Sequence, residues 1–157
     1  MPIADVGVPT TGTAVTVAVS CGRSPSSMPY QIDYRFGSSR ATILYAGHLT
    51  GGDVADAFED LRLRLPEALP RLSVLHDART VKSVVAGPAE IRRMATALNA
   101  LQARAPAGRA AHVGGYEHPR VVGIVRLVLA LVGTSTRERR VFTDIEAALA
   151  WLDDGDA

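Results

Sequence analysis

The amino-acid sequence predicts one α/β domain with a mostly parallel sheet, an opening β-hairpin and four helices, in the order β-β-α-β-α-β-α-β-α. Short apolar runs bounded by glycine alternate with longer segments whose apolar residues repeat at helical spacing. A length of 157 residues, with 47% hydrophobic and 21% charged residues, is typical of a single globular domain. Strands that alternate with helices imply parallel pairing through right-handed crossovers.

The predicted hairpin comes first. Residues 31–36 alternate polar and apolar side chains, and residues 40–46 form a second apolar run that ends at Gly47. A helix follows, because the segment from Thr50 to Asp53 supplies a cap and the next apolar residues repeat at helical spacing. We expect this helix to stop before Pro66.

The remaining strands and helices alternate. Residues 72–75 predict a buried strand that leads into polar residues from His76 onward, and Pro88 lies in the first turn of the second helix. Residues 109–113 predict a strand, and Pro119 opens a third helix. The last elements are a strand over residues 139–142 and a helix capped by Thr143 or Asp144.

The domain is expected to span residues 30–152, with a short C-terminal tail over residues 153–157. Residues 1–29 are rich in Gly, Thr, Ser and Pro and read as a flexible extension, or as one with an added edge strand over residues 13–19. Met28 is an alternative start. No basic residue precedes Arg23, so a secretory signal is not predicted and the expected location is the cytoplasm.

Composition and motifs exclude several function classes. Seventeen basic and sixteen acidic residues give a net charge of +1, which does not indicate a nucleic-acid or membrane-surface partner. A single cysteine excludes an internal disulfide, and the four histidines lack the spacing of a metal site. No phosphate-binding loop, dinucleotide fingerprint or nucleophile elbow is present, so no cofactor is predicted.

Three segments together carry a family resemblance: Gly47-His48-Leu49-Thr50, Leu75-His76-Asp77, and the closing Val141-Phe142-Thr143-Asp144 with Ala147-Ala148-Leu149-Ala150-Trp151-Leu152. They resemble the SpoIIAA-like (STAS-like) family of small bacterial proteins. The resemblance covers roughly residues 30–152. It implies a STAS-like fold, related to anti-sigma-factor antagonists and to CRAL-TRIO lipid-binding domains, and a protein that acts on partners without catalysis.

The sequence departs from the family at the expected phosphorylation site. STAS-like antagonists carry a phosphorylated serine in an Asp-Ser-Ser/Ala-Gly segment that enters the second helix. Here the segment reads Lys82-Ser83-Val84-Val85-Ala86-Gly87-Pro88, with no acidic residue beside the serine. We therefore interpret Ser83 as an ordinary loop hydroxyl and predict no phosphorylation switch.

The third helix is apolar nearly all round over residues 121–132. It is too short to span a membrane and carries Arg126 at its centre. Two interpretations stay open: burial by the sheet and the N-terminal extension, or an exposed apolar face that forms a homodimer or lines a lipophilic ligand site. The candidate interface residues are Val121, Ile124, Val125, Val128 and Leu131.

Polar side chains gather where the parallel strands are expected to end, which is the usual position of a ligand in such a sheet. The candidate binding residues are His48, Thr50, His76, Asp77, Arg79, Tyr116 and His118. His76 and Asp77 are adjacent in a strand, so their side chains should point to opposite faces and should not form a catalytic pair. No catalytic residue is assigned.

Three functions follow from these observations, in descending order of preference. The first is a non-enzymatic STAS-like regulatory or protein-interaction domain, dimeric through the third helix. The second is a protein that binds or carries a small lipophilic ligand. The third is a hydrolase that uses His76 and Asp77.

Overall fold

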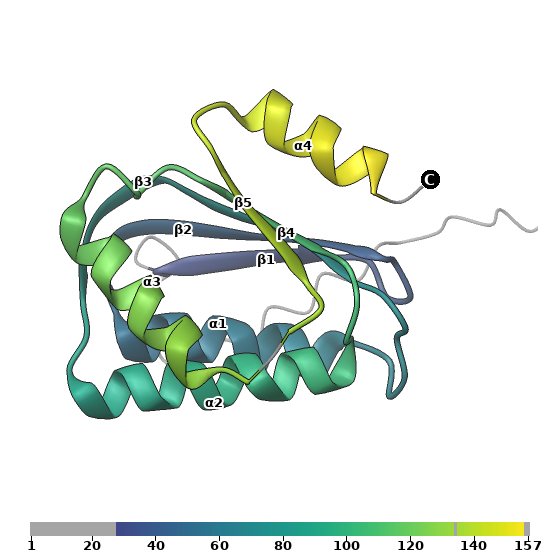
Figure 1. The fold of residues 1–157 in the computed structure, drawn as a ribbon, viewed down its shortest axis with the longest axis horizontal. Helices are drawn as coiled ribbons and strands as arrows, with labels where there is room; N and C mark the ends of the chain where they lie inside the picture. Colours follow the sequence, from purple (N-terminus) through teal and green to yellow (C-terminus); the bar gives the residue numbers. More distant parts are fainter. Residues whose placement is uncertain (1–27, 134, 156–157) are drawn as a thin grey trace, which may run out of the picture.

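A computed structural model describes residues 28–133 and 135–155 and gives the fold of the domain (Figure 1). The described elements follow the predicted order, which is confirmed. They are β1 (Tyr30–Tyr34), β2 (Arg40–Thr50), α1 (Gly51–Arg64), β3 (Ser73–Val85), α2 (Pro88–Arg104), β4 (Arg109–Val113), α3 (Pro119–Leu131), β5 (Glu138–Phe142) and α4 (Ile145–Asp154).

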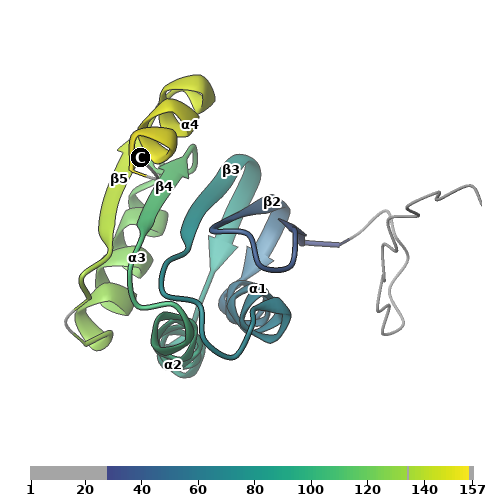
Figure 2. The ribbon, with the colours of Figure 1, turned by 90° about the vertical axis from the view of Figure 1, so that its right-hand side faces the viewer.

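The five described strands form one sheet in the order β1-β2-β3-β4-β5. β1 is antiparallel to β2, and the other neighbours are parallel, as the alternation of strands and helices predicted. Each parallel connection moves one strand further in the same direction, so crossovers of one hand place α1, α2 and α3 on the same face. α4 covers the opposite face (Figures 1 and 2).

Two strands are longer than predicted. β2 continues past Gly47 to Thr50, and β3 runs through His76 and Asp77 to Val85. The two strands pair along this extra length, with register shifts near Gly47, whose φ is +73°. The predicted strand end at His76 and the predicted loop around Ser83 are therefore both wrong, because cross-strand pairing extends both strands beyond their apolar runs.

Two apolar clusters lie on the two faces of the sheet. Alternation along β3 explains this division, because Val74 points toward α1 and α2 whereas Leu75 points toward α4. The larger cluster includes Ile43 and Leu61, both fully buried. The smaller cluster is closed by Leu152, which is also fully buried.

The closing segment behaves as its sequence predicted. Asp144 is the N-cap of α4, and its carboxylate accepts a hydrogen bond from the backbone N–H of Ala147 at 2.9 Å. Trp151 is buried, with the guanidinium carbons of Arg109 and Arg140 at 4.8 and 5.2 Å from its ring centroid. The helix continues past Leu152 to Asp154.

The predicted extension over residues 1–29 falls almost wholly on residues 1–27, which lie outside the described residues. The same holds for the alternative edge strand over residues 13–19. In the part of the chain that the structure describes, no helix is long and apolar enough to cross a membrane.

Candidate functional site

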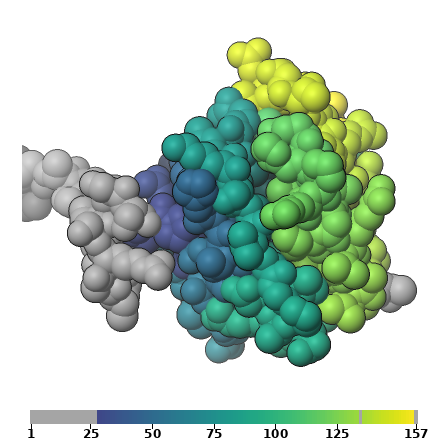
Figure 3. Space-filling view, turned by 90° about the vertical axis from the view of Figure 1, so that its left-hand side faces the viewer, coloured from purple at the N-terminus to yellow at the C-terminus, as the bar shows by residue number. Residues whose placement is uncertain are grey.

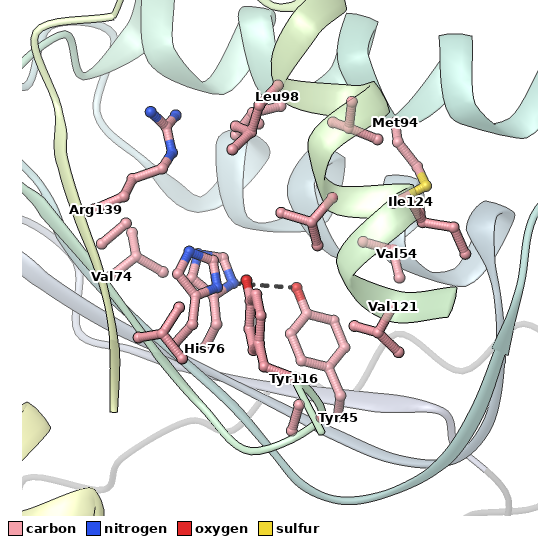
Figure 4. Close-up of a pocket in the computed structure, with 18 of the residues that line it drawn as sticks. Tyr45, Val54, Val74, His76, Met94, Leu98, Tyr116, Val121, Ile124 and Arg139 are labelled. Carbon is pink, nitrogen blue, oxygen red and sulfur yellow. Dashed lines mark hydrogen bonds between the residues drawn. The ribbon is translucent and has the colours of Figure 1, made fainter. Parts of the chain in front are cut away.

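A cavity of about 290 Å³ lies between α3 and the sheet. α3 packs chiefly against α2, and its backbone stands away from the strands. Apolar side chains from α1, α2 and α3 form much of the cavity wall, among them Val54, Met94, Leu98, Val121, Ile124 and Val125 (Figure 4). Figure 3 shows the face where the green surface of α3 meets the teal surface of the preceding elements.

The floor of the cavity is a row of rings from neighbouring strands. His76 of β3 and His112 of β4 are register partners, and their rings stack with centroids 4.5 Å apart. Tyr45 of β2 stacks on the other side of His76, and its hydroxyl oxygen lies 3.4 Å from His76 Nδ1 (Figure 4). Tyr116, in the loop before α3, meets His112 edge to face. Three strands and one loop thus build the floor together.

Burial keeps these rings uncharged. It lowers the pKa of His76 well below its ordinary value, and the neighbouring His112 acts in the same direction. Burial also lowers the pKa of His112 to about 4, with Arg139 contributing. The pKa of Tyr116 rises to about 12 and that of Tyr45 rises further, again through burial. At neutral pH the floor therefore offers neutral imidazole and phenol groups to a ligand.

Arginine side chains from the segment around β5 reach one end of the cavity. Arg137 is buried, and its guanidinium donates hydrogen bonds to the carbonyl oxygens of Leu72, Ala105 and Ala107. Burial, with the nearby charge of Arg139, lowers the pKa of Arg137 to about 10. Arg137 therefore joins the ends of three segments and also brings positive charge to the site.

A pair of glycines shapes the approach to the cavity between β4 and α3. Gly114 and Gly115 have φ of +74° and +79°, a region that favours glycine. A Cβ on Gly114 would lie 2.7 Å from the Cα of Arg79, so the loop passes too close to β3 for a larger residue. This turn places the ring of Tyr116 beside His112 at the end of the floor.

Of the predicted binding residues, the structure brings His76 and Tyr116 together in the cavity. Asp77 points to the opposite face of the sheet. Its carboxylate accepts hydrogen bonds from the Arg79 guanidinium at 2.9 and 2.8 Å and from the Arg79 backbone N–H, and the guanidinium lowers the pKa of Asp77. Asp77 and Arg79 therefore pair with each other, and His76 has no acidic partner on its own face among the residues that the structure describes.

The other predicted binding residues lie elsewhere. His48 is exposed at the end of β2, with Nδ1 at 2.7 Å from Ser83 Oγ of β3. Thr50 forms a capping box with Asp53 at the start of α1. His118 is the exposed N-cap residue of α3. These three positions shape secondary structure away from the cavity.

The candidate interface residues of the third helix divide between two sides. Val121, Ile124, Val125 and Val128 line the cavity, and of these only Val128 is fully buried. Leu131 is on the outer side and 54% exposed. Most of the apolar residues that the sequence suggested as an interface therefore form a wall of the cavity.

Several residues of the site were not predicted from the sequence: Tyr45, Gln102, His112, Arg137 and Arg139. Alternation within the predicted strand places Ala110 and His112 on one face and Ala111 on the other, which was a usable signal for the direction of the His112 side chain. Its pairing with His76 depends on the register between β3 and β4, which no spacing in the chain reveals. Among the described residues, no group of three or more His, Cys, Asp or Glu side chains could hold a metal ion.

Comparison with known proteins gives one solved structure. No protein-family model matches the chain, and no curated protein matches its sequence significantly. The chain is similar to the crystal structure of an uncharacterized protein of the DUF3478 family with a SpoIIAA-like fold from Shewanella loihica PV-4. Sequence identity is 17%, coverage is 78% of this chain and 91% of the other, and the TM-score is 0.48.

Proposed function

We propose that this protein binds a small apolar molecule in the cavity between α3 and the sheet, and that it acts by binding rather than by catalysis. The observation that carries the proposal is the cavity itself. Its volume of about 290 Å³ lies at the lower end of the range of small-molecule sites, and apolar side chains surround a few convergent polar groups. Such an arrangement is the common form of a ligand pocket.

The loose packing of α3 supports the same proposal. Of the residues of α3 only Val128 is buried, although most side chains of the helix are apolar. Apolar side chains that line a space lack contacts on one side, and a ligand in that space supplies them. The position of Asp77 on the opposite face counts against hydrolysis by a His76–Asp77 pair.

The test of this function is native mass spectrometry of the freshly purified protein, followed by calorimetric titration with 1-decanol as a neutral apolar probe. We expect an added mass that denaturation releases, or saturable binding of the probe. Val125→Trp fills the space from the α3 side and should abolish binding. Leu127→Trp is the matched control, because Leu127 lies on the outer side of the same helix and is 55% exposed.

Two results would contradict the proposal. One is a native spectrum without added mass together with no binding of 1-decanol. The other is equal binding by the Val125→Trp and Leu127→Trp variants, which would place the probe on the outer surface. Either result removes the cavity from the function.

The outer side of α3 favours a second candidate function, contact with a second copy of the chain. Leu127 and Leu131 are 55% and 54% exposed on this side, and such apolar exposure is typical of interfaces. We expect light scattering to give a dimer mass that falls to a monomer mass in Leu127→Glu/Leu131→Glu. A monomer mass for the wild type would contradict this second function and would leave the proposed binding of an apolar molecule unaffected.

A further inference from the structure

The side chain of Arg139 enters the cavity from β5. Arg139 pairs in register with Ala110 of β4, and both residues line the cavity. The next residue, Arg140, points to the other face, where it lies over Trp151 and approaches Glu138 at 4.0 Å. Adjacent arginines of one strand therefore serve opposite sides of the sheet.

The guanidinium of Arg139 is incompletely satisfied. Its Nη2 atom is enclosed and has no hydrogen-bond partner among the described residues. Burial lowers the pKa of Arg139, which is the response of a charge removed from water without a counter-charge. Buried charges in proteins are normally paired, so an enclosed and unpaired guanidinium nitrogen indicates a missing acceptor.

No acidic side chain supplies that acceptor. Among the residues that the structure describes around the cavity, none is Asp or Glu, whereas Arg137 and Arg139 both contribute positive charge. Arg137 uses its donors on three backbone carbonyl oxygens, which carry no full negative charge. The cavity therefore has an excess of positive charge at the end nearest β5.

A second unsatisfied donor belongs to a residue of α2 that lines the cavity. Gln102 lines the cavity, and its Nε2 atom is enclosed without a hydrogen-bond partner within the described part of the chain. Gln102 follows Leu98 by one helical turn, so both side chains share one face of α2. In Figure 4 Arg139 reaches from β5 toward the side of α2 that carries Leu98.

The other end of the cavity is apolar. Val54, Met94, Val121 and Ile124 lie at the end away from Arg139 (Figure 4). The cavity is thus amphipathic, with unpaired donors and positive charge at one end and aliphatic side chains at the other. A ligand that matches both ends has an apolar body and an anionic, hydrogen-bond-accepting head.

We propose that the ligand is a small amphiphilic carboxylate, whose carboxylate accepts hydrogen bonds from Arg139 and Gln102 and whose hydrocarbon chain lies against α3. This inference rests on the proposed function and specifies the ligand class. A guanidinium pairs with a carboxylate through two parallel N–H···O bonds, which suits a planar head group. The modest cavity volume favours a medium-length, unbranched chain.

The experiment compares two probes that differ in the head group. Decanoate and 1-decanol are titrated into the full chain by calorimetry at neutral pH and moderate salt. We expect the wild type to bind decanoate about 10- to 100-fold more tightly than 1-decanol, the range of a hydrogen-bonded charge pair. Arg139→Gln should remove this preference, and Gln102→Leu should reduce it.

Arg126→Gln is the matched control. Like Arg139→Gln, this substitution removes one positive charge, but from an exposed position of α3 outside the cavity. The variant should therefore keep the preference for decanoate. Thermal unfolding of each variant without ligand checks that the fold is intact. The comparison of the two probes on the wild type tests the inference even where a variant fails to fold.

The outcomes separate the two proposals. Equal binding of decanoate and 1-decanol by the wild type overturns the carboxylate assignment and leaves the proposed function standing. A preference for decanoate that persists in Arg139→Gln also overturns the assignment. Absence of binding by both probes, together with a native mass spectrum that shows no added mass, overturns the proposed function itself.

Discussion

The two faces of the sheet differ in how closely a helix covers them. On one face α4 lies directly on β3, β4 and β5, and its Trp151 and Leu152 are buried. On the other face α3 is also largely apolar by sequence, yet it packs chiefly on α2 and leaves a cavity over the same strands. The face under α4 is filled by the protein's own side chains, whereas the face under α3 has space for a ligand.

The difference shows that apolar content does not decide how a helix packs. α4 presents a stripe of apolar residues ending in Trp151 and Leu152, and this stripe closes the smaller cluster. α3 is held by α2 on one side, so its remaining apolar side chains face the cavity or the exterior. A close-packed helix contributes stability, whereas a helix that stands off a sheet leaves contacts for a ligand.

The largest expected effect on stability comes from shortening one apolar side chain in each of the two helices, α4 and α3. Leu152→Ala should lower the free energy of unfolding by about 2–5 kcal/mol, because it leaves a void in a closed cluster. Ile124→Ala, on the cavity side of α3, should lower it by about 1 kcal/mol or less, since one side of Ile124 already faces empty space. Urea denaturation of the ligand-free proteins measures both, and equal effects would mean that α3 closes onto the sheet in solution.

The second effect is a pH dependence specific to the cavity face. The pKa of His112, near His76, Tyr116 and Arg139, falls from 6.5 to about 4 in the folded protein, so the unfolded chain takes up a proton first as the pH drops. The free energy of unfolding should therefore fall by about 1–3 kcal/mol between pH 6.5 and about 4. His76 acts in the same direction.

His112→Phe is the variant that isolates this pH effect. The phenyl ring keeps a stacking surface for His76 but takes up no proton, so the slope of stability against pH should become shallower over the same range. Urea denaturation at several pH values measures the slope. An unchanged slope would show that groups outside the cavity produce the acid sensitivity.

The third prediction compares the N-termini of the two helices. Asp144 caps α4 through its side chain, so Asp144→Ala should lower the free energy of unfolding by about 1 kcal/mol. His118 precedes α3 and, within the described residues, makes no side-chain capping hydrogen bond. His118→Ala should therefore leave stability unchanged, and thermal unfolding distinguishes the two. A similar loss in both variants would contradict the assigned caps.

The smallest effect is expected from the adjacent arginines of β5. Arg140→Gln removes the guanidinium that lies over Trp151 and should lower stability by about 0.5–1 kcal/mol. Arg139→Gln removes an enclosed charge and should leave the stability of the ligand-free protein equal or slightly higher. A marked loss in Arg139→Gln, seen in the same denaturation assay, would mean that this charge is satisfied in the free protein.

The sequence predicted the order of the elements and several of their ends. Pro88 and Pro119 each lie at the beginning of the helix that they predicted, and Asp144 is a cap as expected. These features succeed because capping and proline geometry act within a few residues of the chain. The length of β3 was missed, because its second half continues through pairing with β2 and not through its own apolar pattern.

The candidate site divides in the same way. Alternation within a strand correctly separated His76 from Asp77, since successive side chains point to opposite faces. The stacking of His76 on His112 could not be predicted from the sequence, because it arises from the register of two strands that lie far apart in the chain. The role of Arg139 was hidden for the same reason, as a run of arginines does not reveal which of them is enclosed.

The sequence by itself determined the α/β class, the order of the elements, and a third helix with more apolar surface than one packed face requires. Those properties follow from periodicity and local chemistry, which are present in the chain before it folds. Only the tertiary structure decided that α3 packs on α2 and that His76 stacks on His112. It also decided that a cavity remains between α3 and the histidine pair. Distances between elements depend on how all the side chains pack together, and no local pattern contains that information.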